Sequence, residues 1–180
     1  MYWSNVSFIW CVRHSNEELE KWLSEEGFEE RVKDRGIIVR GWAPQVLILS
    51  HPAVGGFLTH CGWNSTLEGV SARLPMVTWP QFADQFLNER FIVNILKIGV
   101  KIGMEVPVTV GEQISVLVKK ANIMAAVKDV MGKEEEGEAR RKRAKELAEM
   151  SNNAMEEGGS SYINLTLMIQ DITEKLAKNT

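Results

Sequence analysis

Short apolar runs alternate with amphipathic segments along much of the chain. The runs are rich in β-branched and aromatic residues and are bounded by glycine or proline, a pattern that predicts buried β-strands. The first run should be buried on both faces. Five strands are expected, at 6–12, 36–42, 54–60, 75–80 and 98–103.

The segments between and after these strands carry helical signals. A break is expected near Gly27, and the helix that begins at Pro44 must end before Pro52. Strands that alternate with helices predict an α/β fold, a parallel doubly wound sheet with its ligands at the carboxyl ends of the strands. The segments expected to contain the helices are 17–34, 43–52, 64–74, 84–96, 112–131, 134–156 and 159–178.

Length and composition describe an ordinary globular domain. A chain of 180 residues with 44% hydrophobic residues can bury a core, and a net charge of −3 gives no overall attraction to nucleic acid or anionic membranes. The two cysteines, Cys11 and Cys61, lack the spacing of a disulfide framework or a zinc site. No signal peptide is recognised, and no apolar run approaches the ~18 residues of a membrane span. These features favour the cytoplasm.

The stretch GFLTHCGWNSTLEG, residues 56–69, is unusually dense in polar and aromatic side chains at a predicted strand-to-helix corner. A strand that ends at His60, followed by Gly62 and a helix opening at Asn64–Ser65, presents backbone N–H groups that can bind an anion. An alternative is purely structural. STLE has the form of a capping box, in which Ser65 caps the helix and Glu68 reaches back. That alternative leaves His60, Trp63 and Asn64 unexplained.

Several phosphate-binding patterns are absent from the sequence. Neither GxGxxG nor GxxxxGK[ST] occurs, and there is no Asp-x-Asp pair to clamp a metal ion. A diphosphate bound at this corner would therefore be neutralised by a helix N-terminus and side-chain donors.

A wider window, residues 42–85, closely resembles the signature box of plant UDP-dependent glycosyltransferases of secondary metabolism. The resemblance runs without a gap over all 44 residues, with WAPQ, HCGWNS, a following glutamate and a closing DQ in register. It continues in FIWCVR, FLNERF and EGGSSYINL, so that it covers essentially the whole chain. The nearest resemblance is to the subgroup that acts on flavonoids and triterpenoids.

This resemblance implies a fold and an activity. Residues 1–180 would form a single, partial UDP-sugar-binding domain, the Rossmann-like C-terminal half of a two-domain GT-B enzyme, with a helical C-terminal region at 112–178. The N-terminal acceptor domain, which carries the family's catalytic base, would be absent, so this chain alone would hold no catalytic base. The intact protein is expected to be a monomer that transfers glucose from UDP-glucose to a hydroxyl of a small plant metabolite, with inversion. The UDP-sugar is a co-substrate, and no metal or other cofactor is implied. The alternative is a truncated, non-catalytic nucleotide-sugar-binding fragment.

The resemblance also assigns roles on the nucleoside side of the site. Trp42 would stack on uracil, although core packing is the commoner fate of a lone tryptophan. The backbone of Ala43 would contact the uracil edge, and Gln45 would lie near the ribose. Glu68 would accept hydrogen bonds from both ribose hydroxyls, which suits a carboxylate.

The phosphate and sugar positions follow in the same way. The diphosphate would be held by His60, Asn64 and Ser65, with Gly62 allowing close approach of the backbone. The sugar hydroxyls would meet Trp63, Asp84 and Gln85. Asp84 also has a structural alternative, a helix cap before QFLNERF.

Three details refine this assignment. His60 lies at the phosphate corner, so it would act on the leaving-group side and not as the base. Gln85 and Trp63 resemble members that use UDP-glucose, whereas histidine or arginine at these positions accompanies other sugars. Arg73 departs from the family, which usually has a small residue there, often glycine, and the backbone is expected to adapt.

A basic run within residues 138–150 offers a competing interpretation. Five basic residues in six positions are compatible with nucleic-acid binding. Helical spacing favours a solvated helix face instead, with ion pairs Glu136–Arg140 and Glu138–Lys142. The opposite, apolar stripe would consist of Ala144, Leu147, Ala148, Ser151 and Met155.

Overall fold

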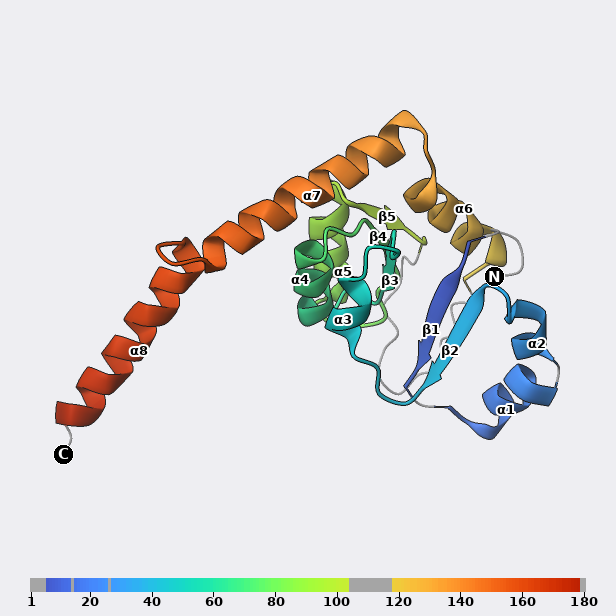
Figure 1. Cartoon of the computed structure of the whole chain (residues 1–180), viewed down its shortest axis with the longest axis horizontal. Coiled ribbons are helices and arrows are strands. Elements are labelled where there is room, and N and C mark those ends of the chain that lie inside the picture. Colours follow the sequence, from blue (N-terminus) through green and yellow to red (C-terminus); the bar gives the residue numbers. More distant parts are fainter. Residues whose placement is uncertain (1–5, 14, 26, 104–117, 179–180) are drawn as a thin grey trace.

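The computed structural model describes residues 6–13, 15–25, 27–103 and 118–178, which form an α/β structure with parallel sheets and a helical C-terminal region (Figure 1). The predicted helical segment 112–117 lies outside the described residues. The strands are β1 (Phe8–Val12), β2 (Gly36–Arg40), β3 (Phe57–Thr59), β4 (Met76–Thr78) and β5 (Gly99–Lys101). The α-helices are α1 (Glu17–Glu20), α2 (Phe28–Val32), α3 (Gln45–Leu49), α4 (Trp63–Ser71), α5 (Gln85–Arg90), α6 (Lys120–Met131), α7 (Glu135–Met155) and α8 (Ser160–Lys178), and π-helical turns η1 (Lys21–Glu25) and η2 (Phe91–Ile95) extend α1 and α5.

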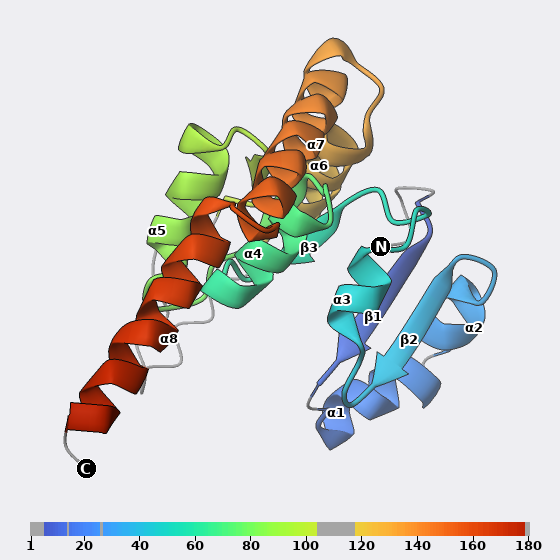
Figure 2. The same ribbon diagram turned by 60° about the vertical axis from the view of Figure 1, so that its left-hand side comes forward.

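Every strand pair is parallel, as predicted, but the sheet is divided into two parts. β1 pairs with β2 from Phe8↔Gly36 to Val12↔Arg40, while the second part has the order β3-β4-β5. Among the described strands no ladder joins β1 to β3, and Figure 2 shows the β1–β2 pair set apart from β3. Each parallel neighbour is reached through a helical crossover, as parallel pairing requires.

The β1–β2 unit has a hydrophobic core of its own. Leu23, Phe28 and Val32 are buried between the strands and the η1–α2 layer, with Trp10 and Trp22 packed against them. The other face is open. Ile9 is 43% exposed and Ile37 60% exposed, so the prediction that the first strand is buried on both faces is wrong.

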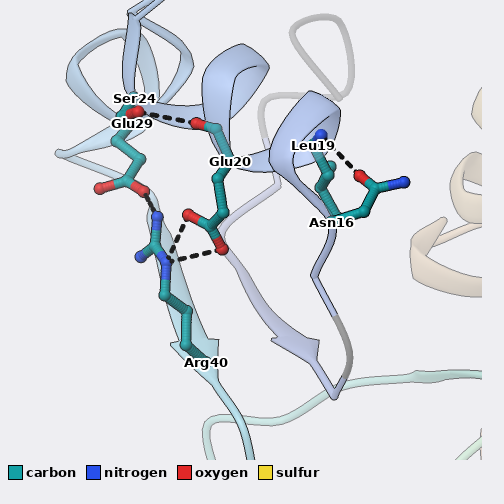
Figure 3. Close-up of polar contacts among 6 residues, drawn as sticks. All are labelled: Asn16, Leu19, Glu20, Ser24, Glu29 and Arg40. Atoms are coloured by element: carbon teal, nitrogen blue, oxygen red, sulfur yellow. Dashed lines mark hydrogen bonds and ion pairs between the residues drawn. The ribbon is translucent and has the colours of Figure 1, made fainter.

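An ion-pair cluster fixes the end of β2 (Figure 3). Arg40 Nε donates to Glu20 Oε2 at 3.0 Å, and its Nη2 donates to Glu29. Hydrogen bonds from Ser15 and from Arg40 lower the pKa of Glu20. The cluster is solvent-exposed, so it contributes little to global stability. Its effect is local, because it ties the strand end to both helices two residues before Trp42.

The break predicted near Gly27 is confirmed, since Gly27 has φ 66° and separates η1 from α2.

The second sheet and its helices form the larger core. All of β4 is buried, and Met76, Ile92 and Ile98 pack with Ala144 of α7.

The basic run of α7 takes part in helix packing. Arg140 Nη1 donates to the carbonyl of Asp129 at 2.9 Å, and Arg141 Nη1 to that of Val130 at 3.3 Å, at the C-terminal end of α6. Cations are favourable at that end of a helix. The predicted Glu136–Arg140 pair is present at 3.5 Å.

Two details of the α7 prediction need correction. Lys142 pairs with Glu146 at 3.9 Å, and not with Glu138. On the apolar stripe, Ala144 and Ala148 are fully buried, but Met155 is 62% exposed. Beyond it, α8 extends away from the sheets in Figure 1, and all of its described residues are exposed.

Arg73 lies at the turn after α4 in the left-handed conformation, with φ 64°. This conformation costs a residue with a Cβ about 1–2 kcal/mol, whereas glycine adopts it freely. We expect Arg73→Gly to raise the free energy of unfolding by roughly 0.5–1 kcal/mol, after the larger entropy of glycine in the unfolded chain is subtracted. Urea titration followed by circular dichroism measures this change. Arg73→Ala is the control, because it removes the side chain and keeps the Cβ; an equal gain in both variants would contradict the backbone explanation.

Candidate functional site

The candidate residues follow the carboxyl ends of three strands. Trp42 comes after β2, His60 directly after β3, and Asp84 after β4. α4 contacts both α3 and α5, so the segments that carry these residues lie on neighbouring elements. The placement agrees with the rule that open parallel sheets bind ligands at this edge.

The backbone turns sharply between β3 and α4. Cys61 has φ 66°, and both of its peptide groups are fixed: its N–H donates to Thr59 Oγ1 at 3.2 Å and its carbonyl accepts from Asn88 Nδ2 at 2.9 Å. Burial raises the pKa of the Cys61 thiol to about 12, so the thiol stays neutral and unreactive at physiological pH. Cys61 is therefore a structural residue of the corner.

The imidazole of His60 lies over Gly62. A Cβ added at Gly62 would lie 2.4 Å from His60 Nε2, which is closer than atoms can approach. Any larger residue at position 62 would displace the His60 side chain. Glycine here thus serves the close approach of an exposed histidine to the start of α4.

The capping-box alternative is wrong. α4 begins at Trp63 with Gly62 as the N-cap residue, and no side chain caps it. Ser65 is in the first turn and not at the cap. The chain turns at Cys61, which adopts the left-handed conformation, and α4 therefore begins at Trp63, before the predicted start. The N-terminus of α4 consequently has no side-chain acceptor, and its N–H groups are available to an anion.

Ser65 and Glu68 point to a common partner instead. Gln45 Nε2, at the start of α3, donates to Glu68 Oε2 at 2.5 Å and lies 3.3 Å from Ser65 Oγ. The structure thus brings together the two residues predicted near the ribose, Gln45 and Glu68. This contact joins α3, the helix that follows β2, to α4.

The tryptophans of the candidate site are not core residues. Trp42 is 78% exposed, so the core-packing alternative for it is wrong. Trp63 is 49% exposed, and the ring of Phe91 lies beside it at a centroid distance of 6.2 Å. An exposed indole beside polar groups can stack on a flat ligand. Ala43 is half-buried and Asn64 is exposed.

Asp84 and Gln85 are held differently from one another. Asp84 occupies the N-cap position of α5 but makes no capping hydrogen bond, and its Oδ2 accepts from Asn88 Nδ2 at 2.8 Å. Gln85 is only 4% exposed, and its Oε1 accepts from the N–H groups of Gln81 and Phe82. Any direct contact of Gln85 with a ligand would use its Nε2 group.

Asn88 is a residue that the sequence did not single out. The signal was its spacing, since Asn88 follows Asp84 by one helical turn within FLNERF. Its second partner, Cys61, is remote in sequence and could not be inferred.

The rest of the described chain adds three observations. Within the described ranges, no group of three or more His, Cys, Asp or Glu side chains could hold a metal ion. An open pocket beside α1, lined by Asn16, Leu19 and Trp22 among others, includes none of the candidate residues. In the described part of the chain, no helix has the length and apolar character needed to cross a membrane.

Comparison with known proteins decides the family. A family model described as UDP-glucoronosyl and UDP-glucosyl transferase matches residues 22–135. The chain belongs to this UDP-glycosyltransferase family. UDP-glycosyltransferase 73E1 of Stevia rebaudiana is 60% identical over 172 residues, which are 94% of this chain and 34% of the relative. UDP-glycosyltransferase 73C5 of Arabidopsis thaliana is 53% identical over 180 residues, 98% of this chain and 36% of the relative. This UDP-glycosyltransferase chain spans about a third of the length of these relatives.

Solved structures of plant UDP-glycosyltransferases confirm the fold class, that of GT-B enzymes. Glycyrrhiza uralensis UGT73P12, complexed with glycyrrhetinic acid 3-O-monoglucuronide, is 42% identical with a TM-score of 0.89, over 97% of this chain and 36% of that one. Medicago truncatula UGT71G1, complexed with UDP-glucose, is 36% identical with a TM-score of 0.77, over 94% of this chain and 34% of that one.

Proposed function

We propose that this chain is the donor-binding half of a plant UDP-glycosyltransferase, which binds UDP-glucose and transfers glucose to a hydroxyl group of a small metabolite. The observation that carries the proposal is the uncapped N-terminus of α4, with His60 folded over Gly62 beside it. Free backbone N–H groups, the positive end of a helix and an imidazole together suit a diphosphate.

The geometry supports separate roles for the residues that would contact the diphosphate, the ribose and the uracil. The first turn of α4, His60 and Ser65 would stabilise the charge that develops on UDP as the bond to the anomeric carbon breaks. Glu68, oriented by Gln45, would accept from the ribose hydroxyls, and Trp42 would stack on uracil. The N–H groups around Asn64 would complete the phosphate contacts. No metal is needed in this scheme, because the helix and side chains supply the positive potential.

The sugar is proposed to be glucose. Trp63, Asp84 and Gln85 would contact its hydroxyls, and no cation among these three would pair with the carboxylate of a glucuronosyl donor. The ligand of UGT73P12 is a monoglucuronide, so UDP-glucuronic acid is the main competitor to test.

The acceptor and the cellular setting are proposals as well. A flavonoid or triterpenoid hydroxyl is the proposed acceptor class, and the protein is proposed to act as a monomer. The proposed location is the cytoplasm, because Asn64-Ser65-Thr66 is an N-x-S/T glycosylation triplet and a glycan on Asn64 would block the phosphate corner. A non-catalytic nucleotide-sugar-binding fragment is the alternative that shares the same donor site.

Titration calorimetry of the purified chain tests the donor site. We expect UDP and UDP-glucose to bind with affinities that EDTA leaves unchanged, UDP-glucose to bind more tightly than UDP-galactose or UDP-glucuronic acid, and His60→Ala to weaken UDP binding about tenfold, the loss of one charge-assisted contact. His51→Ala is the matched control, because His51 is an exposed histidine whose Nδ1 accepts from the N–H of Ala53. Absence of UDP binding, or a loss with EDTA that metal restores, would contradict the proposal.

A further inference from the structure

The side chain of Asn88 bridges two segments of the candidate site that are far apart in sequence. Its Nδ2 group donates to the carbonyl of Cys61 at 2.9 Å and to Asp84 Oδ2 at 2.8 Å. A carboxamide nitrogen has two hydrogens, so both are used. One half-buried amide thus holds the strand-to-helix corner and the carboxylate proposed to contact the sugar.

The Cys61 contact bears on the phosphate side. Cys61 is the left-handed residue at which the chain turns, between His60 and Gly62. Its N–H is held by Thr59 and its carbonyl by Asn88. Rotation of the Cys61–Gly62 peptide group would move the His60 imidazole and the first N–H groups of α4 together. The hydrogen bond from Asn88 therefore fixes their orientation.

The Asp84 contact bears on the sugar side. Because Oδ2 accepts from Asn88, the carboxylate plane is set and Oδ1 is left to accept from a ligand hydroxyl. Without the amide, the exposed Asp84 side chain would rotate among several rotamers, and ordering it on binding would cost free energy.

The position of α5 does not itself depend on Asn88. The neighbouring Glu89 is 4% exposed and accepts from Thr78 Oγ1 of β4 at 2.7 Å. Ile92, in the next turn, is fully buried in the core. A substitution at Asn88 should therefore leave the helix in place and change only what the amide orients.

We propose that Asn88 is a positioning residue that couples the phosphate corner at Cys61 to the sugar-binding carboxylate of Asp84. The inference rests on the proposed function, since it assigns Asn88 a role at the same donor site. It acts through its two partners and does not touch the ligand.

A double-mutant cycle on ligand binding tests the coupling. The purified chain and its variants Asn88→Ala, Asp84→Ala and Asn88→Ala/Asp84→Ala are titrated with UDP-glucose and with UDP, which lacks the sugar. We expect Asp84→Ala alone to weaken UDP-glucose about tenfold relative to UDP, and to have little further effect once Asn88 is alanine. Asn88→Asp keeps the shape but faces Asp84 with a second carboxylate, so it should weaken UDP-glucose more than alanine does.

The controls separate positioning from stability. Asn94→Ala, at an exposed asparagine of η2, should leave both affinities unchanged. A merely structural role would lower both affinities in proportion to the loss of stability and leave the ratio of UDP-glucose to UDP affinity constant. The inference would be overturned if Asn88→Ala left the ratio of UDP-glucose to UDP affinity unchanged. It would also be overturned if Asp84→Ala had an equal effect in the unsubstituted chain and in Asn88→Ala. In both cases UDP binding would still support the donor site. Failure of the unsubstituted chain to bind either ligand would contradict the proposed function and this inference with it.

Discussion

Replacement of Glu68 by alanine is expected to weaken UDP binding by about 1–3 kcal/mol, a factor of roughly 5 to 150. The carboxylate would accept from both ribose hydroxyls, and in the structure it already accepts from Gln45 Nε2 at 2.5 Å. Alanine leaves the ribose hydroxyls without their acceptor and releases Gln45. Desolvated polar groups that lose a partner account for a cost of this size.

Two variants sharpen this experiment. Glu68→Gln keeps the shape of the side chain and one acceptor oxygen, so it should lie between the parent and alanine. Glu149→Ala removes an exposed glutamate of α7 that pairs with Lys145 at 4.0 Å, and it should have no effect. The affinities are measured by calorimetry, with circular dichroism to confirm that the overall helical content is unchanged. Unchanged UDP affinity in Glu68→Ala would show that this carboxylate does not contact the ribose.

The purified chain, supplied with UDP-glucose and a panel of flavonoid and triterpenoid acceptors, is expected to form no glycoside. Transfer requires a bond from the acceptor oxygen to the anomeric carbon, cleavage of the bond to UDP, and removal of the hydroxyl proton by a base. General-base catalysis contributes 10²–10⁴-fold, and alignment of the two substrates about 7–11 kcal/mol at best.

The described residues offer no acceptor-side base with suitable surroundings. His60 lies over Gly62 on the leaving-group side, and His51 accepts from its own turn. The third histidine, His14, lies outside the described residues. Product is sought by mass spectrometry, and UDP binding by the same sample serves as the control for a folded protein. Turnover that depends on the acceptor would show that the chain is a complete catalyst and would favour the enzyme over the binding-fragment alternative.

Much of the fold could be predicted from the sequence because glycine and proline mark its boundaries. The strand at 75–80 is enclosed by prolines, and β4 is found there as Met76–Thr78. The break at Gly27 was predictable because glycine adopts the left-handed conformation freely, and Gly27 has φ 66°. In such places a local signal and the tertiary structure agree.

Other features depend on contacts that no local pattern contains. STLE predicts a capping box, but the left-handed turn at Cys61 starts the helix before Ser65 can cap it. The carbonyl of Cys61 is bound by Asn88, a residue 27 positions away. The division of the sheet between β1 and β3 is likewise a matter of long-range pairing.

The candidate site shows the same limit. The sequence indicated which residues would follow the strand ends, and the structure places Gln45 against Glu68, the two residues predicted near the ribose. Nothing in the sequence indicated that the carboxamide oxygen of Gln85 accepts hydrogen bonds from two backbone N–H groups. Side-chain identity alone does not reveal which of its polar atoms is already engaged.

The divided sheet implies that the molecule contains two cooperative units of unequal stability. The β1–β2 unit has its own core around Leu23, Phe28 and Val32, yet it is below the size, about 40 residues, at which a domain usually holds together unaided. It should therefore open in excursions that leave β3, β4 and β5 folded. Because Trp42 follows β2 whereas His60 follows β3, the nucleoside and phosphate ends of the proposed site belong to different units. A nucleotide that bridges them would suppress these excursions, and it would thereby act as a clamp that merges two folding units into one.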